Sequence, residues 1–152
     1  MYQLWISGRM KKTRKVLLII ILVTIAVIWG QSMLNMEDSS TESSWVMNLV
    51  TPMLEIFVGR GNVTEFIVRK IAHFTEYFVL GFELELYLKR KWLLAAGVGF
   101  VVAFMDETIQ MFSGRGPLIS DVWLDFFGCI TAVAVVGCVM WGIKKWSAKI
   151  SS

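Results

Sequence analysis

The sequence predicts an all-α, polytopic membrane protein with four transmembrane helices and a short interfacial amphipathic helix. The 152 residues are 56% hydrophobic and 18% charged, whereas soluble domains average about 45–50% apolar and about 25% charged. Apolar runs of roughly 20 residues, the length that crosses a bilayer core of about 30 Å, recur along the chain. Basic residues flank these runs. This length allows a single membrane domain, which we expect to cover residues 1–152.

Four apolar runs are long enough to cross a bilayer, and we expect spans at about residues 16–34, 64–88, 92–112 and 119–146. The first run carries no charge and follows a basic stretch, as the apolar part of a signal peptide would. No small-residue cleavage site of the A-x-A kind follows it, and further spans come later. We therefore expect the first run to be an uncleaved transmembrane helix.

A shorter segment, residues 45–58, has apolar residues at helical spacing and one polar face. It is too short and too polar to span a membrane. We expect an amphipathic helix that lies on the bilayer surface and is closed by Gly59 and Gly61.

The distribution of charge predicts the orientation in the membrane. Eleven of the 15 Lys and Arg residues lie in the N-terminal stretch, the loop at 89–91 and the C-terminal stretch. Because basic residues near span ends mark the cytoplasmic side, both termini are expected in the cytoplasm. The net charge of +3 is thus a property of membrane flanks, and we expect no nucleic-acid partner.

Unusual polar residues gather at the opposite, outer ends of the last three spans. At 100° per residue those of each span fall on or beside one face, and burying a charge in lipid costs at least about 2.5–3.5 kcal/mol. We therefore expect these faces to meet in one polar pocket. The residues are Arg69, His73 and Glu76; Asp106, Glu107 and Gln110; Asp121 and Asp125.

Small residues lie deeper on the same faces, at Gly99, Ala103, Gly128 and Ala132. Small side chains let helix backbones approach closely within lipid. At the cytoplasmic end, by contrast, Glu83 and Glu85 are interpreted as a solvated helix end.

The pocket contains the side chains that acid–base or metal chemistry needs. His73 with Glu76 (i, i+3) and Asp121 with Asp125 (i, i+4) could each present two ligands to zinc or manganese. Paired carboxylates could instead share a proton, with His73 as base. The residues alone determine neither the metal nor any cofactor. The candidate catalytic residues are His73, Glu76, Asp106, Glu107, Asp121 and Asp125.

Cationic and polar groups nearby could hold an anion or a lipid headgroup, because Arg binds phosphate and carboxylate bidentately. The alternatives are that Arg69 pairs with a carboxylate, that Lys70 extends to water and that Tyr77 is an interface anchor. The whole cluster could also do no more than fix helix packing. The candidate anion- or lipid-binding residues are Arg69, Lys70, Arg115, Gln110 and Tyr77.

Cys129 and Cys138 are about 13.5 Å apart along a helix axis, which is too far for a disulfide. We expect both to be packing residues.

Three ordered motifs resemble those of the VanZ-like family. The first is Arg69-Lys70-x-x-His73-Phe74-x-Glu76-Tyr77-x-x-Leu80-Gly81. The second is Asp106-Glu107-x-x-Gln110-x-Phe112-x-Gly114-Arg115, and the third is Asp121-x-x-x-Asp125-x-x-Gly128. The resemblance covers about residues 16–137 and assigns no reaction.

The resemblance implies a setting, because the named member of the family is associated with low-level resistance to the glycopeptide teicoplanin. It implies a multi-pass protein of a bacterial cytoplasmic membrane, in a Gram-positive envelope. The expected partners are membrane lipids or a lipid-linked cell-wall precursor. An enzyme or lipid-binding protein, a structural or partner-binding protein and a small transporter all remain open, as does the oligomeric state.

Overall fold

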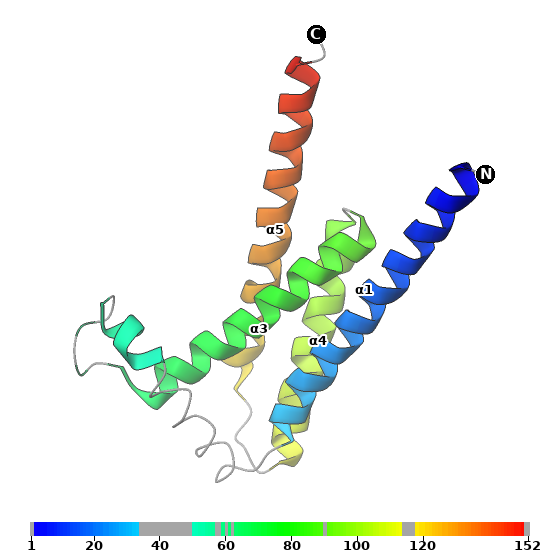
Figure 1. Cartoon of the computed structure of the whole chain (residues 1–152). Coiled ribbons are helices and arrows are strands. Elements are labelled where there is room, and N and C mark those ends of the chain that lie inside the picture. Colours follow the sequence, from blue (N-terminus) through cyan, green and yellow to red (C-terminus); the bar gives the residue numbers. More distant parts are fainter. Residues whose placement is uncertain are drawn as a thin grey trace.

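The computed structural model describes residues 2–33, 50–56, 59, 61, 63–89, 91–113 and 118–150, and every regular element in these ranges is an α-helix. The predicted all-α class is therefore confirmed. A short helix occupies residues 50–56. The long helices, shown in Figure 1, are α1 (Tyr2–Ser32), α3 (Glu65–Leu88), α4 (Trp92–Phe112) and α5 (Ile119–Ile150).

The helix bounds follow the predicted runs closely in the middle of the chain and extend beyond them at both ends. Helix α4 has the predicted bounds, and α3 begins one residue later than expected. Helix α1 also includes the basic residues before the first apolar run, and α5 continues past Lys144 and Lys145. Lys and Arg are good helix formers, so the helices do not stop where their apolar surface stops.

Three helices are long and apolar enough to cross a membrane: Lys11–Ser32, Trp92–Phe112 and Ile119–Ile150. Helix α3 has 24 residues, about 36 Å at 1.5 Å per residue, so its length suffices. Six acidic or basic residues along it, from Glu65 to Glu85, lower its hydropathy. A fourth span at α3 therefore stays a prediction.

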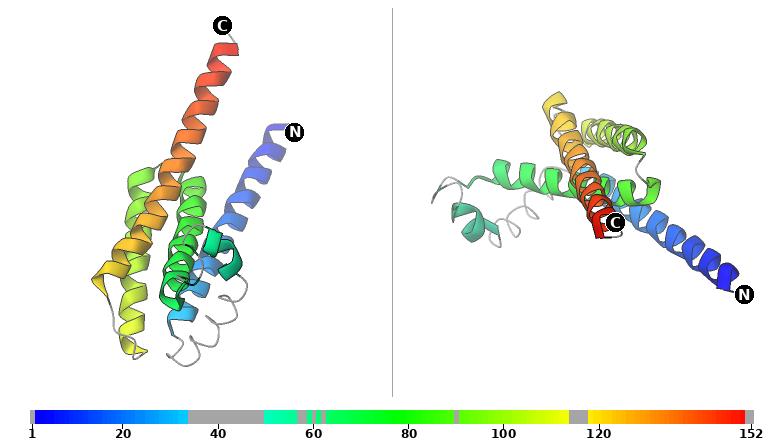
Figure 2. Two further views of the ribbon diagram at one scale, coloured as in Figure 1. Left: turned by 90° about the vertical axis from the view of Figure 1, so that its left-hand side faces the viewer. Right: turned by 90° about the horizontal axis from the view of Figure 1, so that it is seen from above.

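The outward surface of the bundle is apolar. On α1, for example, Ile19 is 60% exposed and Leu22 is 57% exposed. Apolar surface of this extent is rare on soluble monomers, and a bilayer is the environment that would cover it. Both termini lie at the same end of the bundle (Figures 1 and 2), while α4 ends and α5 begins at the other.

Helices α3 and α5 cross in close backbone contact because glycines lie at the crossing. A Cβ atom on Gly128 would lie 2.5 Å from the Phe74 carbonyl oxygen, and one on Gly81 would collide with the Cys129 carbonyl. On α4, a Cβ on Gly99 would collide with the Cys129 sulfur. The predicted small-residue faces are thus buried helix contacts, and Cys129, a free thiol, is part of that packing. Cys138 is also free but exposed, so its expected packing role is not met within the chain.

The acidic residues near the C-terminal end of α3 correct the interpretation of a solvated helix end. Glu83 is 8% exposed and Glu85 is 2% exposed. The Thr24 hydroxyl of α1 donates a hydrogen bond of 3.0 Å to Glu83. The sequence suggested solvent because Lys89 and Arg90 are close in the chain, but helix packing places both carboxylates inside the bundle.

The predicted amphipathic segment is helical where the structure describes it, at residues 50–56; residues 45–49, 57 and 58 lie outside the described part. The Gly59 amide donates to the Glu55 carbonyl at 3.0 Å, and Gly59 and Gly61 have positive φ values of 89° and 78°. The expected glycine closure is therefore confirmed, and a position on the bilayer surface stays a prediction.

Gly128→Ala should destabilise the protein, because its new methyl group meets the backbone of α3 and neither helix can yield cheaply. Overpacking of this kind costs about 1–3 kcal/mol, which thermal unfolding in detergent would register as a lower melting temperature. Gly137→Ala on the same helix is the matched control, since nothing lies within 4 Å of its added Cβ. Equal melting temperatures for the two variants would contradict the close crossing.

Candidate functional site

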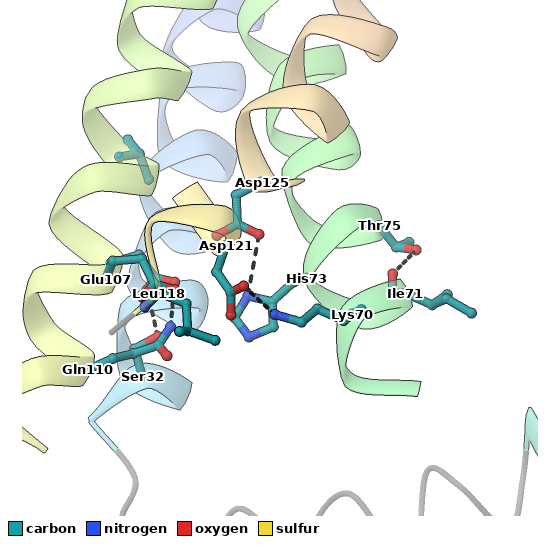
Figure 3. Close-up of polar contacts among 12 residues, drawn as sticks. Ser32, Lys70, Ile71, His73, Thr75, Glu107, Gln110, Leu118, Asp121 and Asp125 are labelled. Atoms are coloured by element: carbon teal, nitrogen blue, oxygen red, sulfur yellow. Dashed lines mark hydrogen bonds and ion pairs between the residues drawn. The ribbon is translucent and has the colours of Figure 1, made fainter. Parts of the chain in front are cut away.

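Polar side chains from four helices meet at the end of the bundle opposite the termini (Figure 3). The last turn of α1, the first half of α3, the last two turns of α4 and the first two turns of α5 contribute them. They are Ser32; Lys70 and His73; Asp106, Glu107 and Gln110; Asp121 and Asp125. In the remainder of this article they are called the polar cluster, together with Glu76 and Tyr77.

His73, Asp106 and Asp125 form the centre of the polar cluster. One potential ligand atom from each lies within 4.8 Å of the others. His73 Nδ1 is 3.6 Å from Asp125 Oδ1. Asp106 and Asp125 are both fully buried, with 0% exposure. Three helices that are separate in sequence therefore bring an imidazole and two carboxylates together, a set that can hold a metal ion or exchange protons.

Asp106 is held in place from two sides. The Ser32 hydroxyl of α1 donates a hydrogen bond of 2.6 Å to Asp106 Oδ1, and Gln110 Nε2 donates one of 3.2 Å to Oδ2. Gln110 therefore helps to position Asp106, and its expected binding of an anion stays a prediction. The Asp106 carboxylate links α1 to α4.

Two site residues on α1 were missed by the sequence reasoning. Ser32 is 1% exposed, and the Gln31 side chain hydrogen-bonds to Glu76. Their signal was available, because Gln31 and Ser32 are adjacent polar residues at the C-terminal end of the first apolar run. That depth is the same as the depth of the other polar groups.

Arg69 and Lys70 are the described members of the candidate anion-binding cations, and each pairs with an acidic residue. Lys70 forms an ion pair with Asp121 of α5 and lies over the Phe66 ring, 5.1 Å from its centroid. Arg69 pairs with Glu65 of its own helix at 2.8 Å, and both side chains are partly exposed. The structure thus shows Arg69 paired with a carboxylate, which was one of the alternatives. Lys70 was expected to extend to water in the other alternative, but it pairs with Asp121. Arg115 lies outside the described residues.

Glu107 and Tyr77 are both buried. Glu107 Oε2 accepts a hydrogen bond of 3.1 Å from the Leu118 amide, which ties α4 to the start of α5. Tyr77 is 0% exposed, so its interpretation as an interface anchor is wrong. Its hydroxyl lies within electrostatic range of Asp106 and Asp125 and has no hydrogen-bond partner in the described part of the chain.

The polar cluster is acidic overall. Each of its carboxylates lies within electrostatic range of at least one other: Glu76, Asp106, Glu107, Asp121 and Asp125. Lys70 and His73 are the basic groups among its members. Neighbouring buried carboxylates cannot all stay ionised unless a cation lies between them; otherwise at least one of them binds a proton. The polar cluster therefore favours binding of cations or protons.

An apolar groove of about 710 Å³ adjoins the polar cluster. Its walls come from α1, the helix at 50–56 and α3, and its polar side chains are Thr24, Thr75 and Glu76. Glu76 therefore borders the groove and also lies in the polar cluster.

These features define a multi-pass membrane protein with a buried acidic site at one end of its helix bundle. The family model described as VanZ/LLP1 matches residues 16–141, most of the chain. The chain belongs to this family, as the three motifs suggested. No curated protein and no solved structure shows a significant match to the chain.

Ser32→Ala should lower the stability of the protein, because it leaves the fully buried Asp106 without one of its donors. Removing a partner from a buried polar group costs about 1–3 kcal/mol and more when the group is charged. The melting temperature in detergent measures the effect.

Thr131→Val is the control for that measurement, because the Thr131 hydroxyl is exposed and donates only to the Phe127 carbonyl of its own helix. A loss in Ser32→Ala no larger than that in Thr131→Val would show that the bond to Asp106 contributes little.

Proposed function

We propose that this protein binds or acts on an anionic, lipid-linked substrate of the bacterial cell envelope, at the outer leaflet of the cytoplasmic membrane. The observation that carries the proposal is the position of Glu76, which borders both the apolar groove and the polar cluster. A ligand with one polar and one hydrocarbon end fits such a junction. The groove has the volume typical of small-molecule sites, about 300–1,000 Å³ with mostly apolar walls.

The hydrocarbon part of the substrate would lie in the groove between α1 and α3. The groove walls are formed mainly by Val, Ile, Leu and Met side chains. An acyl or isoprenoid chain could enter from the surrounding lipid without crossing a polar barrier. The headgroup would then reach His73 and Lys70, which precede Glu76 in the sequence and lie closer to the N-terminal end of α3.

The chemical setting also supports an envelope substrate. The VanZ-like family, to which the motifs are similar, includes a member associated with teicoplanin resistance, and teicoplanin binds cell-wall precursors outside the membrane. In this proposal Lys70 contacts the anionic headgroup, and His73 and Glu76 exchange protons. Asp106, Glu107, Asp121 and Asp125 bind water or a metal.

The outer location follows from the positive-inside rule, because the basic flanks lie at the end of the bundle opposite the polar cluster. A cysteine at Ser113, beside the polar cluster, should react with a membrane-impermeant maleimide in intact cells, whereas one at Lys89 should not. The background is Cys129→Ala with Cys138→Ser. Labelling of Lys89→Cys and not of Ser113→Cys would invert the orientation.

Lys70→Met and His73→Gln should each weaken binding of a polyprenyl phosphate at least about tenfold, since a lost charge-assisted contact to the phosphate is worth about 1.5–3 kcal/mol. Binding can be measured with purified protein in detergent, with the uncharged polyprenol as matched ligand. Glu83→Gln, a buried carboxylate of α3 outside the polar cluster, is the control variant.

Undiminished binding in both cluster variants, or equal affinity for polyprenol and its phosphate, would contradict the proposal.

A structural role is the second candidate, favoured by the hydrogen bonds that Asp106 receives from α1 and α4. If the polar cluster only fixes helix packing, the same substitutions should lower the melting temperature in proportion to any activity they lose. Melting curves and binding data from the same preparations separate the two functions.

A further inference from the structure

We infer that His73, Asp106 and Asp125 form a binding site for one divalent transition-metal ion, Mn²⁺ or Zn²⁺. The three residues come from α3, α4 and α5, and one ligand atom of each lies within 4.8 Å of the other two. A mixed set of one imidazole and two carboxylates suits these ions, because imidazole favours Zn²⁺ and carboxylate favours Mn²⁺. The inference deepens the proposed function and rests on it only for the role of the ion.

The spacing of the donor atoms is close to that of a coordination sphere. At metal–ligand distances of about 2.1 Å, neighbouring donors of a tetrahedral site lie about 3.4 Å apart. His73 Nδ1 and Asp125 Oδ1 are already 3.6 Å apart. Donors within 4.8 Å of one another would need to approach by at most about 1.4 Å to reach that spacing.

A second observation points to a ligand at the same place. Asp125 is fully buried, and neither of its carboxylate oxygens has a hydrogen-bond partner among the residues that the structure describes. Leaving a buried charged group without such partners costs several kcal/mol. A metal ion bound by Asp125 and His73 would remove that cost.

The surroundings of Asp106 resemble an outer coordination shell. Carboxylate ligands of metal sites are themselves hydrogen-bonded, and these outer partners orient them. Ser32 and Gln110 do this for Asp106, one on each oxygen.

A metal ion would also explain how an acidic site can receive an anionic headgroup. Three protein ligands leave at least one coordination position for a water or substrate oxygen. A phosphate oxygen could take that position, so that the ion lies between the buried carboxylates and the substrate. Lys70 is already paired with Asp121 and alone would not offset the five carboxylates.

The test is metal binding by the full-length protein, purified in detergent with a tag that lacks histidine and then freed of metal with EDTA. Titration calorimetry with Mn²⁺ and with Zn²⁺ should show one ion per chain for at least one of them. Asp125→Asn should weaken the affinity more than about 100-fold, beyond the loss of about 10–100-fold typical of outer-shell partners.

Two further variants are expected to have a smaller effect, or none, on the metal affinity. Gln110→Leu removes a partner of Asp106 and should weaken binding about 10–100-fold. Glu83→Gln removes a buried carboxylate of α3 that already accepts a hydrogen bond from Thr24, and it should leave the affinity unchanged. Wild-type protein that binds neither ion, or Asp125→Asn protein that binds as tightly as wild type, would overturn the inference.

Spectroscopy of the wild-type protein keeps the test decisive if Asp125→Asn does not fold. His73 is the single histidine of the sequence, so electron spin echo spectra of bound Mn²⁺ should show nitrogen coupling from one imidazole. If Zn²⁺ alone binds, visible spectra after Co²⁺ substitution replace this readout. Bound metal without a signature of imidazole ligation would overturn the inference.

The outcomes for the ion and for the substrate are separable. Metal binding is measured without lipid, so a bound ion together with absent polyprenyl phosphate binding would refute the proposed function and leave the metal site standing. Lipid binding that is unaffected by EDTA, in protein that binds no metal, would refute the metal site alone.

Discussion

The requirement that every buried charge find a partner within an apolar bundle determines how this protein is arranged. Four helices carry ionisable or polar groups to one end, and the fully buried Asp106 and Asp125 lie there together with His73. None of these helices could bury its polar groups alone. The close crossing of α3 and α5, made possible by Gly81 and Gly128, brings the polar faces of these two helices within reach of each other.

Much of this architecture could be predicted, because helical periodicity and the cost of placing charge in lipid both leave a visible pattern in the sequence. A helix repeats its face every 3.6 residues, so the spacing of His73, Asp106 and Asp125 together with the order of the spans was sufficient to predict that they meet. The glycines at the helix contacts followed from the same faces. Composition alone does not mark α3 as a span, because the helix carries six acidic or basic residues, of which Glu83 and Glu85 are buried by packing.

The features that the sequence did not predict concern individual side-chain partners. A side chain with several possible partners within reach can pair with any of them, and the sequence does not say which. Arg69 could reach either the polar cluster or Glu65 one turn away, and the structure shows the local pair. Glu83 and Glu85 lie near basic residues in sequence, yet the neighbouring helices cover them. Ser32 lacks a charge that would single it out, although its hydroxyl binds Asp106.

Hydrogen bonds hold helix α1 to the rest of the bundle, among them those from Thr24 to Glu83 and from Ser32 to Asp106. The same helix forms one wall of the apolar groove, and much of its remaining surface is turned outward. An outward tilt of α1 would therefore widen the groove and withdraw a donor from Asp106 in the same motion. Because a bilayer would surround this wall, membrane thickness and tension would act on the acidic centre through α1.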